Sequence, residues 1–114
     1  MKVSKLVAKY KLKDGNNNII WLLKIILKIW CMFNLCKNLT NIEELKYLDV
    51  KYCSNFSYMF YDCLSLKDIK PLENWNVSNG TDFSWMFYGC SSLKDIKPLE
   101  KWNLNENTFK SIFI

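Results

Sequence analysis

Three of the five cysteines are evenly spaced, at Cys36, Cys63 and Cys90. Thiols at a regular spacing can pack as small apolar residues, form disulfides or bind a metal ion. The chain has no histidine and no Cys-x-x-Cys pair, so zinc has little to bind it. We therefore expect these cysteines to pack in the core, with a disulfide between neighbouring units as the alternative, and we expect no metal and no cofactor.

Catalysis requires recognisable combinations of side chains, and this chain has none of them. We find no Ser/His/Asp or Cys/His combination, no paired carboxylates and no phosphate-binding loop. We therefore predict that the protein is not an enzyme and look for residues suited to binding.

Aromatic residues provide the first candidate binding surface. If neighbouring units stack, Tyr58 lies beside Trp85 and Tyr61 beside Tyr88, and the four rings form an outward patch. Aromatic residues are enriched at protein interfaces. The alternative is that the rings only shield the seams between units.

Charged residues provide the second candidate surface. Asp68 and Lys70 recur as Asp95 and Lys97, and we expect them to form short ladders on one face of a sheet. The alternative is a solvated surface of mixed charge.

These residues recur because the chain is a tandem repeat with a period of 27 residues. Residues 56–81 and 83–108 are identical at 18 of 26 aligned positions, and a diverged copy covers about 29–55. A period of this length indicates that each unit buries its apolar face on its neighbours. The predicted units are 29–55, 56–82 and 83–108, with a partial unit at 109–114.

Within one unit the pattern predicts a helix, a strand and an Asn-rich loop. Apolar residues at Phe83, Met86, Phe87 and Cys90 have the i, i+3, i+4, i+7 spacing of a short helix. A short extended segment follows, and Pro98 ends it because proline has no amide hydrogen. The predicted fold is an α/β repeat solenoid, and we expect each indole nitrogen of Trp75 and Trp102 to bond to a neighbouring unit.

The N-terminal residues 1–28 are predicted to form a cap, built as a hairpin. A basic amphipathic helix over 19–33 also fits, with Lys24 and Lys28 on one face. Because these two lysines interrupt the apolar stretch, we do not expect it to span a membrane.

The composition bears on other classes of function. The net charge is +5, but all sixteen basic residues are Lys and they lie among acidic residues. Nucleic-acid binding favours Arg and a block of one charge, so we do not expect it. We also recognise no targeting signal.

The repeat pattern Met-Phe-x-x-Cys-x-x-Leu-x-x-Ile over about 29–114 resembles the BspA-like leucine-rich repeats of bacterial and protist surface proteins. The resemblance implies a solenoid of the leucine-rich-repeat type with a parallel sheet on one face. It also implies a surface or secreted protein with a role in adhesion.

We therefore expect a non-catalytic protein-interaction module of the BspA-like type, with a protein partner. The alternatives are a fragment or decayed copy of a larger repeat protein, and a membrane-surface protein that uses residues 19–33. Phe109 and Phe113 begin a further stripe without a polar unit after it, so we also expect end-to-end self-association through the C-terminus.

Overall fold

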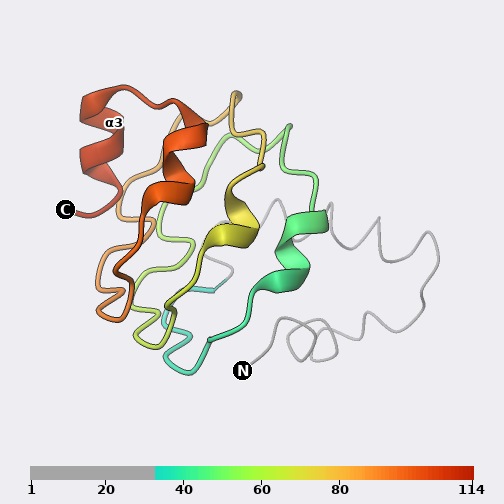
Figure 1. Cartoon of the computed structure of the whole chain (residues 1–114). Coiled ribbons are helices and arrows are strands. Elements are labelled where there is room, and N and C mark those ends of the chain that lie inside the picture. Colours follow the sequence, from blue (N-terminus) through green and yellow to red (C-terminus); the bar gives the residue numbers. More distant parts are fainter. Residues whose placement is uncertain (1–32) are drawn as a thin grey trace.

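The computed structural model describes residues 33–114. Within this range the helical elements are three 3-10 helices and one short α-helix: η1 (Glu43–Tyr47), η2 (Lys70–Leu72), η3 (Lys97–Trp102) and α3 (Glu106–Ser111). The 3-10 helices lie side by side in a row, and α3 follows at the end of the chain (Figure 1). The predicted cap over 1–28 lies outside the described residues, as does all but the last residue of the alternative helix over 19–33.

The predicted α/β repeat solenoid is wrong. Residues 33–114 contain no strand and no sheet, and their ladder contacts are isolated bridges, such as the parallel bridge between Asn55 and Asp82. The helix expected from Phe83 to Cys90 is a run of turns, and the segment expected to be extended leads into η3. The reason lies in the backbone: Trp85 and Gly89 have φ values of 56° and 78°, which a right-handed helix does not tolerate.

Backbone hydrogen bonds join each run of turns to the next unit, and they alternate with hydrogen bonds inside the unit. In residues 56–63, which we call the turn arc of the second unit, the N–H of Phe60 donates to the carbonyl of Met86 in the third unit at 2.8 Å. The N–H of Tyr61 instead donates within its own unit, to Tyr58 at 3.1 Å. Two other bonds of the arc also run from the second unit to the third, from residues 58 and 62 to residues 84 and 88, and the N–H of Phe56 donates to Asp82 just before the third unit. The arcs are therefore held together without becoming strands.

Asn and Asp side chains close a turn at the start of the second and of the third turn arc. The Oδ1 atom of Asn55 accepts from the N–H of Ser57, and Asp82 does the same for Ser84 (both 2.9 Å). Such Asx turns satisfy backbone donors locally. They account for polar residues at fixed positions of the repeat.

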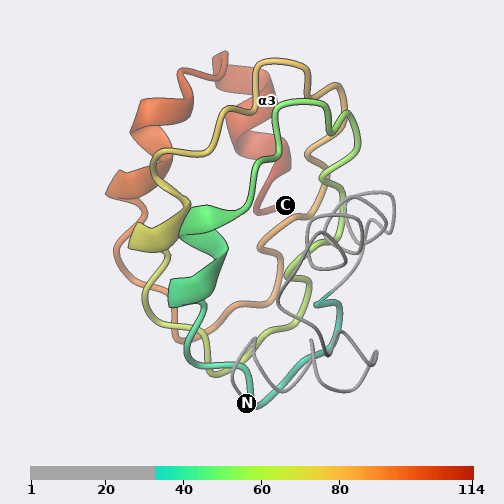
Figure 2. The same ribbon diagram turned by 90° about the vertical axis from the view of Figure 1, so that its right-hand side faces the viewer.

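Aromatic rings 27 residues apart stack in columns through the core. Phe33, Phe60 and Phe87 form one column, with ring centroids 5.3 and 5.1 Å apart and every ring at least 98% buried. The rings of Trp75 and Trp102 lie parallel, 6.4 Å apart. Figure 2 shows the units stacked in register, turn arc on turn arc.

The prediction for the tryptophan nitrogens is confirmed. Trp75 Nε1 donates to the carbonyl of Leu45 at 2.8 Å, and Trp102 Nε1 donates to that of Leu72 at 2.9 Å. Each indole therefore ties its unit to the preceding one. A buried Trp N–H needs such a partner because an unpaired polar group is costly in the core.

The C-terminal residues cover the third unit. The N–H groups of Trp85 and Phe87 donate to the carbonyls of Ser111 and Ile112, at 2.8 and 3.1 Å. Ile112 is fully buried and the ring of Phe113 packs 6.4 Å from that of Phe87. End-to-end association remains a prediction, but the open apolar end on which it was based is occupied by this segment.

Candidate functional site

The structure brings the four predicted aromatic residues together on the turn arcs. The rings of Tyr58 and Trp85 meet edge to face at 5.2 Å, and those of Tyr61 and Tyr88 stack at 5.3 Å. Tyr58 also lies 5.6 Å from Tyr61, so the four rings are continuous. Trp85 is 40% exposed and Tyr88 43% exposed. We call this set the aromatic surface.

An unusual backbone conformation presents two of these rings. The φ values are 60° at Tyr58 and 56° at Trp85. Residues with a Cβ atom rarely adopt this left-handed region, which costs about 1–2 kcal/mol relative to the right-handed one. The same strain in two successive units is a reproducible feature of the repeat.

The Tyr61 hydroxyl keeps its proton at neutral pH. Loss of hydration raises the pKa of Tyr61, and the negative charge of Asp62 and the neighbouring phenols of Tyr88 and Tyr58 raise it further. A protonated phenol both donates and accepts hydrogen bonds. The aromatic surface therefore combines apolar rings with hydroxyl groups.

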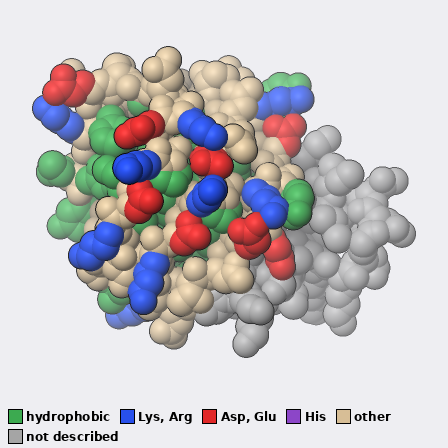
Figure 3. Space-filling model, in the orientation of Figure 1, with side chains coloured by type: hydrophobic (Ala, Val, Ile, Leu, Met, Phe, Trp, Pro, Cys, Tyr) green, Lys and Arg blue, Asp and Glu red, His purple; other side chains and the backbone are tan. Residues whose placement is uncertain are grey.

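The second candidate surface also forms, but not on a sheet. Asp68, Lys70, Asp95 and Lys97 border one hollow of about 640 Å³ beside η2 and η3. We call these four residues, with Glu73 and Lys101, the charged face. Figure 3 shows acidic and basic side chains intermixed over this side of the molecule.

The aspartates of the charged face have a structural task. Asp68 Oδ1 accepts from the N–H of Lys70 at 2.8 Å, and Asp95 Oδ1 accepts from the N–H of Lys97 at 3.0 Å. Each aspartate thus closes the turn that begins a 3-10 helix. The predicted ladders on a sheet are wrong because no strand forms here, and one oxygen of each carboxylate is already engaged.

Sequence reasoning missed two features near these surfaces. The first is the ion pair between Lys101 and Glu73, 3.6 Å apart, which joins the second and third units. The second is a hollow of about 590 Å³ beside Trp102. A signal for the hollow was present, because the Asn79-Gly80 turn pair has no counterpart in the third unit.

No disulfide joins cysteines within residues 33–114, and Cys53, Cys63 and Cys90 are buried in the core, with Cys36 packed partly buried against it. Cys63 Sγ donates to the carbonyl of Phe33, and Cys90 Sγ donates to that of Phe60, each at 3.1 Å. Burial raises the pKa of Cys63 to about 12 and that of Cys90 to about 11. These thiols are therefore poor nucleophiles.

Two further searches of residues 33–114 bear on function. No group of three or more His, Cys, Asp or Glu side chains in this range is placed to hold a metal ion. No helix in the same range is long and apolar enough to cross a bilayer.

Comparison with known protein families identifies the chain. A family described as "Mycoplasma protein of unknown function, DUF285" matches residues 2–113. The chain belongs to the DUF285 family. No curated protein and no solved structure matches it. The DUF285 description assigns no function, so a function has to be argued from the surfaces described above.

Proposed function

We propose that this DUF285 protein is a non-catalytic module that binds a protein partner through the aromatic surface. The observation that carries the proposal is the continuity and exposure of its rings. Trp85 and Tyr88 are 40% and 43% exposed, while the equivalent stacks of Phe residues are buried. Exposed Trp and Tyr side chains are the residues that contribute most to protein–protein binding.

The geometry of the aromatic surface favours recognition over simple shielding. Two rings of the surface, those of Tyr58 and Trp85, are held in left-handed backbone positions. A residue that only covered a seam would gain little from such a strained conformation. Rings fixed by stacking also lose little side-chain entropy when a partner binds.

The charged face is the weaker candidate. Its aspartates are engaged in turns, and Glu73 is paired with Lys101. Exposed charges of mixed sign contribute little to affinity, because water and salt compete for them. We assign it a role in solubility and in joining the units.

The resemblance to BspA-like surface proteins supports the same class of function. That resemblance rests on the Met59-Phe60/Cys63/Leu66 pattern and its recurrence. It implies adhesion, which is a form of protein binding. It does not depend on the predicted sheet.

The test is selection of ligands from a display library of protein fragments, followed by affinity measurements on single variants. Trp85→Ser and Tyr88→Ser should each weaken a selected ligand about 30-fold or more, the effect of losing a binding hot spot of about 2 kcal/mol. Thermal unfolding must show that both variants fold.

Tyr52→Ser is the matched control, because Tyr52 is 83% exposed and lies outside the aromatic surface. It should leave affinity unchanged. The proposal would be refuted if every ligand selected from the library bound the Trp85 and Tyr88 variants with the same affinity as the wild type.

A further inference from the structure

The return loops of the first and second units are joined by hydrogen bonds. Asn79 Nδ2 donates to the carbonyl of Lys51 at 2.6 Å. The N–H and hydroxyl of Thr81 both donate to the carbonyl of Ser54, at 2.7 and 3.2 Å. The Asn-Gly-Thr turn of the second unit thus fits against the loop before it.

The same bonds do not form between the second and third units. Ser78 and Thr81 are the counterparts of Lys51 and Ser54, yet their carbonyls accept no hydrogen bond from the described residues. Glu106 takes the place of Asn79 and has no amide to donate. Thr108 takes the place of Thr81, and its N–H instead caps α3 by donating to Asn105 Oδ1 at 2.8 Å.

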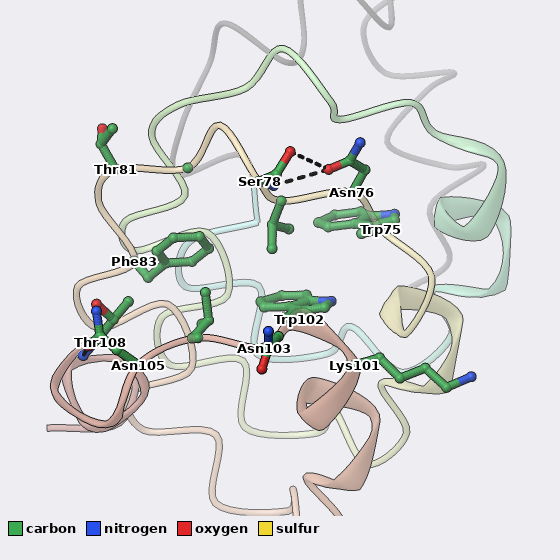
Figure 4. Close-up of a pocket in the computed structure, with 13 residues that line it drawn as sticks. Trp75, Asn76, Ser78, Thr81, Phe83, Lys101, Trp102, Asn103, Asn105 and Thr108 are labelled. Carbon is green, nitrogen blue, oxygen red and sulfur yellow. Dashed lines mark hydrogen bonds between the residues drawn. The ribbon is translucent and has the colours of Figure 1, made fainter.

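A hollow of about 590 Å³ lies where the missing contact would have been. This volume is within the range of small-ligand sites, about 300–1,000 Å³. Polar residues make up most of its lining, and the apolar side chains among its walls include Val77, Phe83, Trp102 and Leu104. Figure 4 shows the rings of Phe83 and Trp102 between the loop that carries Asn76 and Ser78 and the loop that carries Asn103 and Asn105.

We propose that this hollow binds a peptide turn of the Asn-Gly-Thr type from another polypeptide. Such a turn carries the donors that the hollow lacks: a side-chain amide for the carbonyl of Ser78, and a backbone N–H and a hydroxyl for that of Thr81. The first and second units provide the template, since the same turn makes these bonds there. Its apolar part packs on the walls of the hollow.

The site is separate from the aromatic surface and does not depend on the proposed function. None of Tyr58, Tyr61, Trp85 and Tyr88 lines the hollow. The two sites can therefore be tested and can fail independently.

The test is an NMR titration of the full chain with the capped peptide Asn-Val-Ser-Asn-Gly-Thr-Asp, the sequence of residues 76–82. Shifts should appear at the amides of Gly80, Thr81 and Thr108 and at the indole N–H of Trp102. A peptide with Asp in place of the second Asn and Val in place of Thr lacks two donors. It should bind about tenfold more weakly.

Two variants block the hollow from opposite walls. Thr108→Trp and Ser78→Trp retain the backbone bonds to Asn105 and Asn76 and should each weaken binding about tenfold or more. Lys110→Trp is the control, because this residue is exposed on α3 and does not line the hollow.

A preserved indole signal of Trp102 reports that a variant is folded. If only one of the two variants folds, that variant alone is sufficient to test the proposal. The proposal is overturned by an absence of shifts at millimolar peptide. It is also overturned by shifts that gather at Trp85 and Tyr88, or by equal binding of the two peptides.

Discussion

Two sets of stacked rings run through the same turn arcs, and they differ in burial and not in geometry. Phe60 and Phe87 stack at 5.1 Å inside the core, while Tyr61 and Tyr88 stack at 5.3 Å on the surface. Members of the two sets are adjacent in sequence. One backbone register therefore sets both spacings, and the side on which a ring lies determines whether it stabilises the fold or is available to a partner.

The difference follows from the alternation within the arc. Phe60 and Phe87 are buried, while the residue after each, Tyr61 or Tyr88, is at least partly exposed. Inside, the Phe rings exclude water completely. Outside, each Tyr has a hydroxyl group that can bond to water or a partner, which makes the same stacking compatible with exposure.

Phe60→Ala tests the buried set. It should lower the free energy of unfolding by about 3–5 kcal/mol, because a fully buried ring is replaced by a cavity between two others. Tyr61→Ala should cost under about 1 kcal/mol. Chemical denaturation measures both, and comparable losses would mean that the two sets are not distinguished by burial.

The buried thiols predict a pH dependence. The pKa of Cys63 is raised from 9.0 to about 12 and that of Cys90 from 9.0 to about 11, chiefly by burial. The folded state thus holds protons that the unfolded state releases. Stability is fully present below pH 9 and falls as pH rises toward the folded values, by up to about 1.4 kcal/mol per pH unit for each thiol.

Denaturation midpoints at about pH 8 and about pH 10.5 measure this loss. Cys63→Ala is the control and should show a shallower decline, because Cys90 alone then contributes. A decline of the same slope in both proteins would assign the effect to other groups.

Gly89→Ala tests the turn that separates the two sets. Gly89 has a φ of 78°, and an added Cβ would collide with Asp62 Oδ1. The carboxylate can move away, but the backbone cost of about 1–2 kcal/mol remains. In an Asp62→Ala background, with that single variant as the reference, the Gly89→Ala substitution avoids the carboxylate and should isolate the backbone term. An unchanged unfolding midpoint in Gly89→Ala would mean that this φ is not required.

Asp82→Ala tests the start of the third turn arc and should have the smallest effect, about 1 kcal/mol, comparable to loss of a helix cap. The carboxylate accepts from the N–H of Ser84. Asp82→Asn keeps the accepting oxygen, as Asn55 does in the unit before, and should be close to wild type. Equal losses in Ala and Asn variants would point to the charge instead of the hydrogen bond.

The period of 27 and the apolar positions were readable from the sequence, and they account for the stacked rings and the Trp hydrogen bonds. The type of element was not. An i, i+3, i+4 pattern is shared by a helix and by a run of turns with the same repeat, and the positive φ values of Trp85 and Gly89 separate them. A tryptophan side chain gives no indication that residue 85 adopts a positive φ.

The proline was misread for a related reason. The sequence pattern predicts that Pro98 ends a strand, but Pro98 lies in the first turn of η3, where its fixed φ is favourable and its missing N–H costs nothing. The same pattern places Asp95 in a surface ladder, although Asp is a preferred turn-closing residue. The loss of the Asn79-Gly80 turn pair in the third unit marks where the repeat changes, but the sequence does not show that a hollow beside Trp102 results.

The direction of the hydrogen bonds between arcs has a consequence for how such a chain can change in length. The arc of the second unit donates to the arc after it, and the arc of the third donates to Ser111 and Ile112. Every internal unit thus offers carbonyls to the unit before it and N–H groups to whatever follows. A duplicated or deleted block of 27 residues would meet matching groups on both sides, and the terminal segment would serve a longer or shorter stack equally well. Insertion or deletion of a whole unit then preserves the hydrogen bonds between neighbouring units. Insertion or deletion of a single residue instead shifts these bonds out of register.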